Sequence, residues 1–118
     1  GLDRAAEAEV HFRHALESRR ATLGDDNEDV LFNLADIAKA LAKQGKKQEA
    51  ERILREVVAD HRRTFGDDHL NSGDLSFDLA IVLRDQGKLV EAEVLFSQVM
   101  ASWRRSYGNR SRYTLRAM

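Results

Sequence analysis

Cysteine and proline are absent from the 118 residues, and aromatic side chains make up only 7% of them. The lack of cysteine excludes a disulfide framework and thiolate metal sites, and it fits a reducing compartment, so we predict a cytoplasmic protein. No apolar run approaches the roughly 20 residues that cross a bilayer, and no signal-peptide pattern follows Gly1. Because the formal net charge is −1, nucleic acid and membrane surfaces are not expected partners.

What the chain does contain is a pattern that returns every 42 residues. Aligned at this spacing, residues 24–65 and 66–107 share 16 identical positions. A period of this length is typical of a repeat array, in which each unit covers its apolar face with its neighbours. We therefore expect a single array over residues 1–118, divided into the second helix of a partial repeat (1–23), two full repeats (24–65 and 66–107) and the start of a further repeat (108–118).

Apolar residues recur at spacings of three and four, which predicts amphipathic helices. We expect helices over 4–22, from the Asp25-Asp26-Asn27 caps to about Lys43, over 47–64, near 70–85 and near 89–106. Gly45 and Gly87 mark short turns, so the helices on either side of each should form antiparallel hairpins. The residues expected to face inward are Ala8, Phe12, Ala15, Leu16, Val30, Leu34, Ile37, Ala38, Leu41, Ala50, Ile53, Leu54, Val57, Val58, Leu75, Leu79, Ala80, Leu83, Ala92, Leu95, Phe96, Val99 and Met100.

Four positions affect the ends of these helices. Gly24 is expected to end the first helix in the left-handed conformation. Gly73 and Ser76 weaken the start of the helix near 70–85. The Gly at position 108 should end the helix near 89–106, with the following residues starting a new helix.

Each copy opens with Gly-Asp-Asp, places a small Ala38 or Ala80 in its first helix, turns at Gln-Gly-Lys and continues with Glu-Ala-Glu. This order of motifs resembles the tetratricopeptide repeat, and the 42-residue length resembles the variety found in kinesin light chains and in the sensor halves of some nucleotide-binding signalling ATPases. The resemblance implies an all-α, right-handed superhelical solenoid of antiparallel helix hairpins. The sequence departs from the family at the paired groove asparagines, which are replaced by Ala35-Asp36 and Phe77-Asp78.

Other clusters have a structural explanation that we prefer to a chemical one. His11 and His14 lie three apart, but no third ligand is placed to complete a metal site with them. The Arg pairs at 19–20, 62–63 and 104–105 occupy last helical turns, where cations interact favourably with the helix dipole. Trp103 is expected to pack against the next repeat. With no nucleophile, phosphate-loop or acid–base motif, we expect no catalytic residue, no cofactor and no metal.

After the core residues are assigned, one side of the helix near 70–85 has no assigned role. In a stacked array the first helix of each repeat lines the concave surface, and Phe77 and Ile81 fall opposite Leu75, Leu79 and Leu83. They either bind a ligand or pack on the neighbouring first helix. The expected partner-binding residues on this concave surface are Phe32, Ala35, Asp36, Lys39, Lys43, Asp74, Phe77, Asp78, Ile81, Arg84 and Asp85.

The predicted function is therefore recognition of a peptide or helix of a partner protein in this groove. Two alternatives stay open: a regulatory sensor or scaffold domain of a larger signalling ATPase, and an oligomerisation scaffold. The terminal helices lack part of their repeats, so they should leave apolar surface uncovered and favour self-association.

Overall fold

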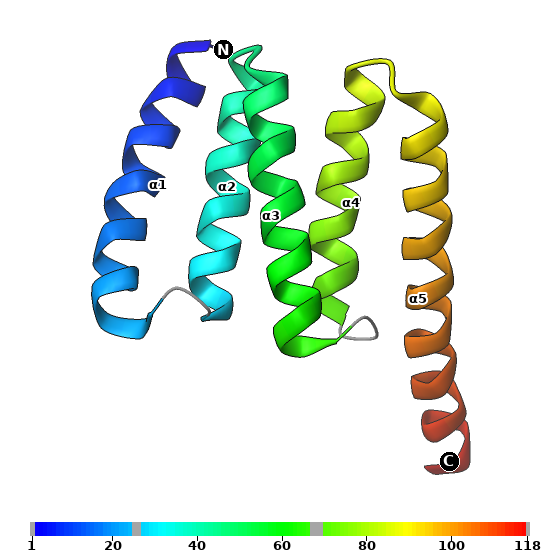
Figure 1. Ribbon diagram of the computed structural model, residues 1–118. Helices are drawn as coiled ribbons and strands as arrows, with labels where there is room; N and C mark the ends of the chain where they lie inside the picture. Colours follow the sequence, from blue (N-terminus) through cyan, green and yellow to red (C-terminus); the bar gives the residue numbers. More distant parts are fainter. Residues whose placement is uncertain (1, 25–26, 67–69, 118) are drawn as a thin grey trace.

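The computed structural model describes residues 2–24, 27–66 and 70–117, and every regular element in these ranges is an α-helix. The five helices lie side by side in chain order and alternate in direction (Figure 1). The all-α helical repeat predicted from the sequence is thus confirmed. The helices are α1 (Leu2–Leu23), α2 (Glu28–Lys43), α3 (Lys47–Phe65), α4 (Leu70–Asp85) and α5 (Leu89–Ala117).

Glycine with positive φ forms the two hairpin turns, as predicted. Gly45 has φ +88° and Gly87 has φ +83°. After α2, the Lys46 amide donates to the Leu41 carbonyl at 2.9 Å and the Gly45 amide donates to the Ala42 carbonyl at 3.0 Å. These are the two hydrogen bonds of the Schellman motif, and they recur after α4 at the matching positions. The repeated Gln-Gly-Lys run is therefore a helix stop that reverses the chain.

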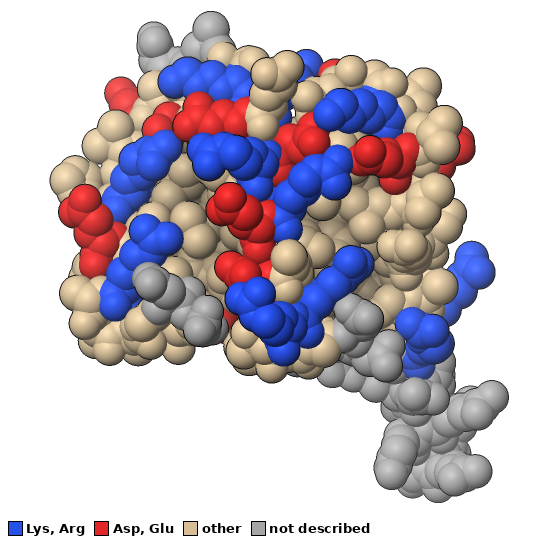
Figure 2. All heavy atoms as spheres, viewed as in Figure 1, with Lys and Arg blue, Asp and Glu red and all other residues tan. Residues whose placement is uncertain are grey.

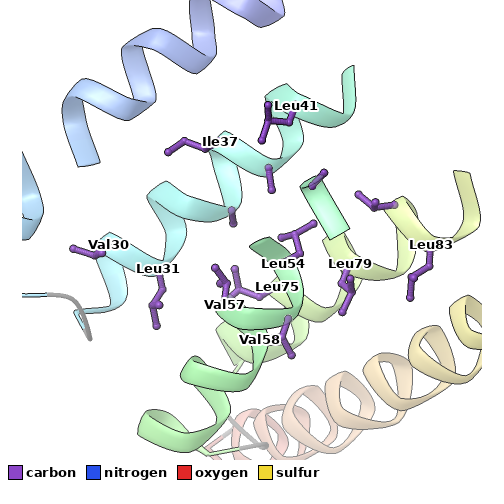
Figure 3. Packing of buried hydrophobic residues seen from close by; sticks show 14 of the residues in the cluster. Val30, Leu31, Ile37, Leu41, Leu54, Val57, Val58, Leu75, Leu79 and Leu83 are labelled. Carbon is purple, nitrogen blue, oxygen red and sulfur yellow. The ribbon is translucent and has the colours of Figure 1, made fainter. Parts of the chain in front are cut away.

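The core is one continuous cluster shared by all five helices, and Figure 3 shows its part between α2, α3 and α4. Nearly all residues expected to face inward are buried or packed against it. Residues of α2 that were not expected inside, such as Leu31 and Asn33, are buried too. The reason is that α2 packs against α1, α3 and α4, so more than one stripe is covered.

Met100 is an exception, because 46% of it is exposed although an inward position was predicted. Its counterpart one repeat earlier, Val58, is only 6% exposed, since α4 packs against α3 there. No described helix packs against α5 in the corresponding way.

Two predictions about helix ends need correction or completion. Helix α5 does not end before position 108 but continues to Ala117. Gly66 is followed by Asp-Asp, whereas the Gly at 108 is followed by Asn-Arg, so the acidic pair that opens the earlier copies is missing. At α2, Asn27 is the N-cap and its Oδ1 accepts from the Asp29 amide at 2.9 Å. Asp25, Asp26 and the Asp pair at 67–68 lie outside the described residues.

The start of α4 is built around a contact that the sequence did not predict. Gly73 is buried, and a Cβ there would overlap the indole Nε1 of Trp103 and lie 3.1 Å from its Cδ1. Trp103 therefore packs inside its own hairpin, not against the next repeat as predicted. Glycine at position 73 makes room for the indole ring.

Candidate functional site

Helix α4 presents two opposite sides, and the predicted site lies on one of them. Successive residues rotate by about 100° around a helix, which places Leu75, Leu79 and Leu83 in the core and Asp78, Ile81 and Asp85 away from it. The second group faces α2, since α2 and α4 are in contact. We call the surface formed by these sides of α2 and α4 the α2–α4 face.

A concavity of about 310 Å³ opens on the α2–α4 face. Its centre is apolar and its rim carries both charges. Lys39 crosses it, because its Nζ lies 3.3 Å from Asp78 Oδ2 on α4 and 3.8 Å from Asp36 Oδ1 on α2. The residues that line it are Lys39, Ala42, Lys43, Asp78, Ile81, Val82 and Asp85.

A second concavity, of about 470 Å³, lies between α1 and α2 and shares Lys39 and Lys43 with the first. Lys43 makes no ion pair among the described residues, and neither does Arg4, which adds a further positive charge. The two hollows therefore adjoin at the two lysines of α2. The second is lined by Arg4, Ala5, Ala8, Phe12, Asp36, Lys39, Ala40 and Lys43.

Asp78 is the most perturbed titratable group on this face. Burial raises the pKa of its carboxyl, and the nearby Asp74 and Asp36 raise it further, while the Lys39 ammonium opposes both effects. Lys39 thus lies between the carboxylates of Asp36 and Asp78. A ligand that displaced Lys39 from Asp78 would have to supply another positive charge in its place.

Of the predicted site residues, Asp36, Lys39, Lys43, Asp78, Ile81 and Asp85 come together around these hollows. The others are not among the residues that line the two hollows. Ala35 is 1% exposed, Asp74 is exposed, and Arg84 donates to the neighbouring Asp85 at 3.4 Å.

The two aromatic candidates belong to ring clusters. The centroid of Phe77 lies 5.4 Å from that of Phe96 and 5.7 Å from that of Trp103, both on α5. Phe32 lies 6.4 Å from the ring of His61 on α3. Each contact is with a second helix of a hairpin. These contacts within each hairpin explain why Phe77 and Phe32 are half-buried, without a ligand in the groove or packing on the neighbouring first helix.

Sequence reasoning missed Arg4 and the part of the surface contributed by α1. Arg4 and Lys39 are far apart in the chain, and only the packing of α1 on α2 brings them to one hollow. The 42-residue period does not indicate such a contact.

A second missed feature is a set of polar contacts that joins consecutive repeats. Gln44 donates to Glu9 at 2.8 Å, and Gln86, 42 residues later, donates to Glu51 at 2.7 Å. Lys88 Nζ also lies 2.8 Å from Glu51, and these contacts, the Lys88 one above all, lower the pKa of Glu51 to about 2. Because the four residues of the two pairs recur at the period, their spacing was a usable signal for this contact.

A third missed feature is the buried His61, which is 0% exposed. Its Nε2 lies 2.8 Å from Glu28 Oε2 on α2, and its Nδ1 lies 2.7 Å from Ser72 Oγ on α4. Asn71 adds a 3.0 Å hydrogen bond to Glu28. One imidazole therefore links three helices and two repeats.

The remaining clusters noted in the sequence are the two histidines of α1 and the three arginine pairs. His11 and His14 are exposed on α1, and no group of three metal-ligating side chains occurs within the part of the chain that the structure describes. Of the arginine pairs, Arg19 donates to Asn33, Arg62 to Ser76 at 3.5 Å and Arg63 to Asp60 at 2.6 Å. Figure 2 shows Lys and Arg mixed with Asp and Glu around α3 instead of forming one basic ridge.

Over the described ranges, no helix has the length and apolarity to cross a membrane.

Comparison with known proteins gives one result. A family model described as a tetratricopeptide repeat matches residues 1–29, 34–71 and 78–113. These three segments cover most of the chain. Among curated proteins, no match is found.

Proposed function

Since the chain belongs to the tetratricopeptide repeat family, whose repeats generally mediate protein–protein interaction, we propose that it binds a peptide or helix of a partner protein on the α2–α4 face. The observation that carries this proposal is the hollow between α2 and α4 that Lys39, Lys43 and Ile81 line. It combines an apolar floor with a charged rim, the arrangement expected of a specific recognition site. In a longer right-handed superhelical solenoid this face is the concave one.

The preferred ligand is a segment with an apolar anchor and acidic neighbours. Ile81 and Ala42 offer an apolar surface for the anchor. Arg4 and Lys43 offer positive charge that no described carboxylate neutralises. Acidic residues flanking the anchor would speed the encounter and fix its orientation.

The test uses a peptide selected from a displayed random library against the wild-type chain. Ile81→Ala and Lys43→Glu should each weaken its binding about ten-fold or more while the melting temperature changes little. Arg52→Glu makes the same charge change at an exposed position of α3 and is the matched control, expected to bind normally. Unchanged binding by both site variants would refute the proposal.

Phe77 and Phe32 remain proposed anchors, and Phe77→Ala separates the two roles. An anchor predicts lost binding in a stable protein. A packing residue predicts a lower melting temperature with normal binding by the fraction that is folded, and the contacts with Phe96 and Trp103 favour this second outcome.

The finer assignments rest on the sequence: the subtype on the length of the repeat, the location on the lack of cysteine, and the absence of catalysis on the lack of catalytic motifs. We propose a kinesin light chain-like, non-catalytic module that is cytoplasmic. A regulatory sensor or scaffold domain of a signalling ATPase is the alternative: a Walker A motif upstream in the parent gene would support it, and a coiled coil upstream would support a motor adaptor. Oligomerisation is a further alternative, to which exposed Val90 and Val94 on the last helix are relevant.

A further inference from the structure

Helix α5 carries a stripe of exposed apolar and small residues that take no part in the core of the repeat. Val90 is 78% exposed and Val94 54% exposed, and Ser97 and Ala101 continue the same line at spacings of three and four. All four residues are exposed. Figure 2 shows the middle of α5 as largely uncharged, with acidic side chains toward its upper end and basic ones lower down, in contrast to the charged surface over α3.

The equivalent stripe on α3 lies 42 residues earlier and is polar except at Ala59, which matches Ala101. Gln48, Arg52 and Arg55 stand where α5 has Val90, Val94 and Ser97. These α3 residues are exposed even though α4 packs against α3. A following repeat would therefore leave the α5 stripe uncovered as well. On α1 only Val10 is a valine in this line, followed by Arg13 and Glu17.

The ends of the α5 stripe carry opposite charges. Glu91 and Glu93 lie beside its start, and Arg104 and Arg105 lie at its end. At about 100° per residue, Glu93 and Arg104 lie on one flank of the stripe. Glu91 lies on the other flank and pairs with Arg55 of α3 at 2.5 Å. A second copy of the same helix running antiparallel, centred near Gln98, would place Glu93 of each copy against Arg104 of the other.

Side-chain size is complementary in the same arrangement. Val94 of one copy would meet the small Ala101 of the other, and the short Ser97 at the centre would let the two helices approach closely. From this complementarity of charge and size we infer that the α5 stripe is a self-recognition surface, which pairs two copies of the chain antiparallel about a two-fold axis.

The surface is distinct from the α2–α4 face, so it stands or falls independently of peptide binding. One helix per copy buries less than the roughly 800 Å² per partner of a standard interface. The dimer should therefore be weak, with a dissociation constant in the micromolar range or above.

Sedimentation equilibrium over a wide concentration range tests the dimer. Val94→Arg installs the residue that α3 carries at the matching position, so the fold should tolerate it while dimerisation weakens at least ten-fold. Val10→Arg makes the same change at the same register position of α1, where the valine is 56% exposed, and should leave dimerisation unchanged. A wild-type chain that stays monomeric at the highest concentration, or equal effects of the two variants, would overturn the inference.

Charge reversal tests the direction of pairing. Glu93 and Arg104 make no ion pair within the described ranges, so changing them disturbs no described intrachain contact. Glu93→Arg and Arg104→Glu should each weaken dimerisation, and the double variant should restore it. Additive losses in the double variant would refute antiparallel pairing.

Cross-linking gives an independent readout, because the chain has no cysteine of its own. An equimolar mixture of Val94→Cys and Ala101→Cys chains should oxidise mainly to the mixed disulfide. Predominance of the Val94→Cys homodimer would indicate parallel pairing and contradict the inference.

Discussion

Replacing Glu51 with glutamine should destabilise the chain, and the loss should disappear at low pH. Glu51 holds the next repeat through Gln86 and Lys88, and it also accepts from Arg55 at 2.8 Å. Together these contacts lower the pKa of its carboxyl from 4.5 to about 2. Such a shift corresponds to at most roughly 3 kcal/mol of stability. Because Arg55 and Lys88 are 45% and 47% exposed, solvent screening reduces the expected loss to about 1–2 kcal/mol.

The sign of the pH dependence follows from the lowered pKa. The folded chain holds the ionised carboxylate more firmly than the unfolded chain does, so the contribution is complete above about pH 4.5 and falls as the pH drops toward 2. Urea unfolding of wild type and Glu51→Gln at pH 7 and at successively lower pH measures it.

Glu93 provides the matched control for this experiment. It occupies the same register position as Glu51, but no described turn follows to bind it. Glu93→Gln should change stability by no more than about 0.5 kcal/mol. Equal effects of the two substitutions, or a Glu51→Gln loss that persists unchanged below the folded pKa, would refute the reasoning.

Four further predictions concern the fold and the absence of catalysis. Gly87→Val should cost roughly 1–3 kcal/mol because φ is +83° there, and an unchanged urea midpoint would show that the turn does not need glycine. Gly73→Ala should cost about 1–3 kcal/mol through overlap with Trp103, and Trp103→Phe in the same chain should recover part of it in thermal melts, whereas additive losses would contradict the contact. His61→Leu should cost about 1–3 kcal/mol, since Glu28 and Ser72 each lose one hydrogen bond, and a more stable variant in urea would contradict this. The pure chain should not turn over nucleotides, esters or glycosides, and a turnover abolished by one point substitution would overturn that expectation.

The helices and most of the core were predictable because each is determined by local spacing. Leu54 and Leu83 are fixed by the three-and-four pattern, and Gly45 by the need for positive φ at a helix stop. Contacts between side chains of different helices were harder to predict. The placement of Trp103 depended on the space that Gly73 leaves in a different helix, and no periodicity indicates such a vacancy.

The candidate site was predictable only in part for a related reason. A helical wheel shows that Ile81 lies opposite the core, but it cannot show that Phe77 reaches Phe96 on the partner helix. Likewise, the wheel of α2 identifies Lys39 and Lys43, whereas the contribution of Arg4 depends on how α1 crosses α2. Residues on one helix were found, and surfaces shared between helices were not.

The most direct test of peptide recognition on the α2–α4 face is an NMR footprint of a library-selected peptide on the ¹⁵N-labelled chain. The largest shift changes should cluster at Lys39, Lys43, Asp78 and Ile81, and Ile81→Ala should abolish them in a folded protein. Shift changes confined to the exposed sides of α3 and α5, with an undisturbed α2–α4 face, would contradict peptide recognition on this face.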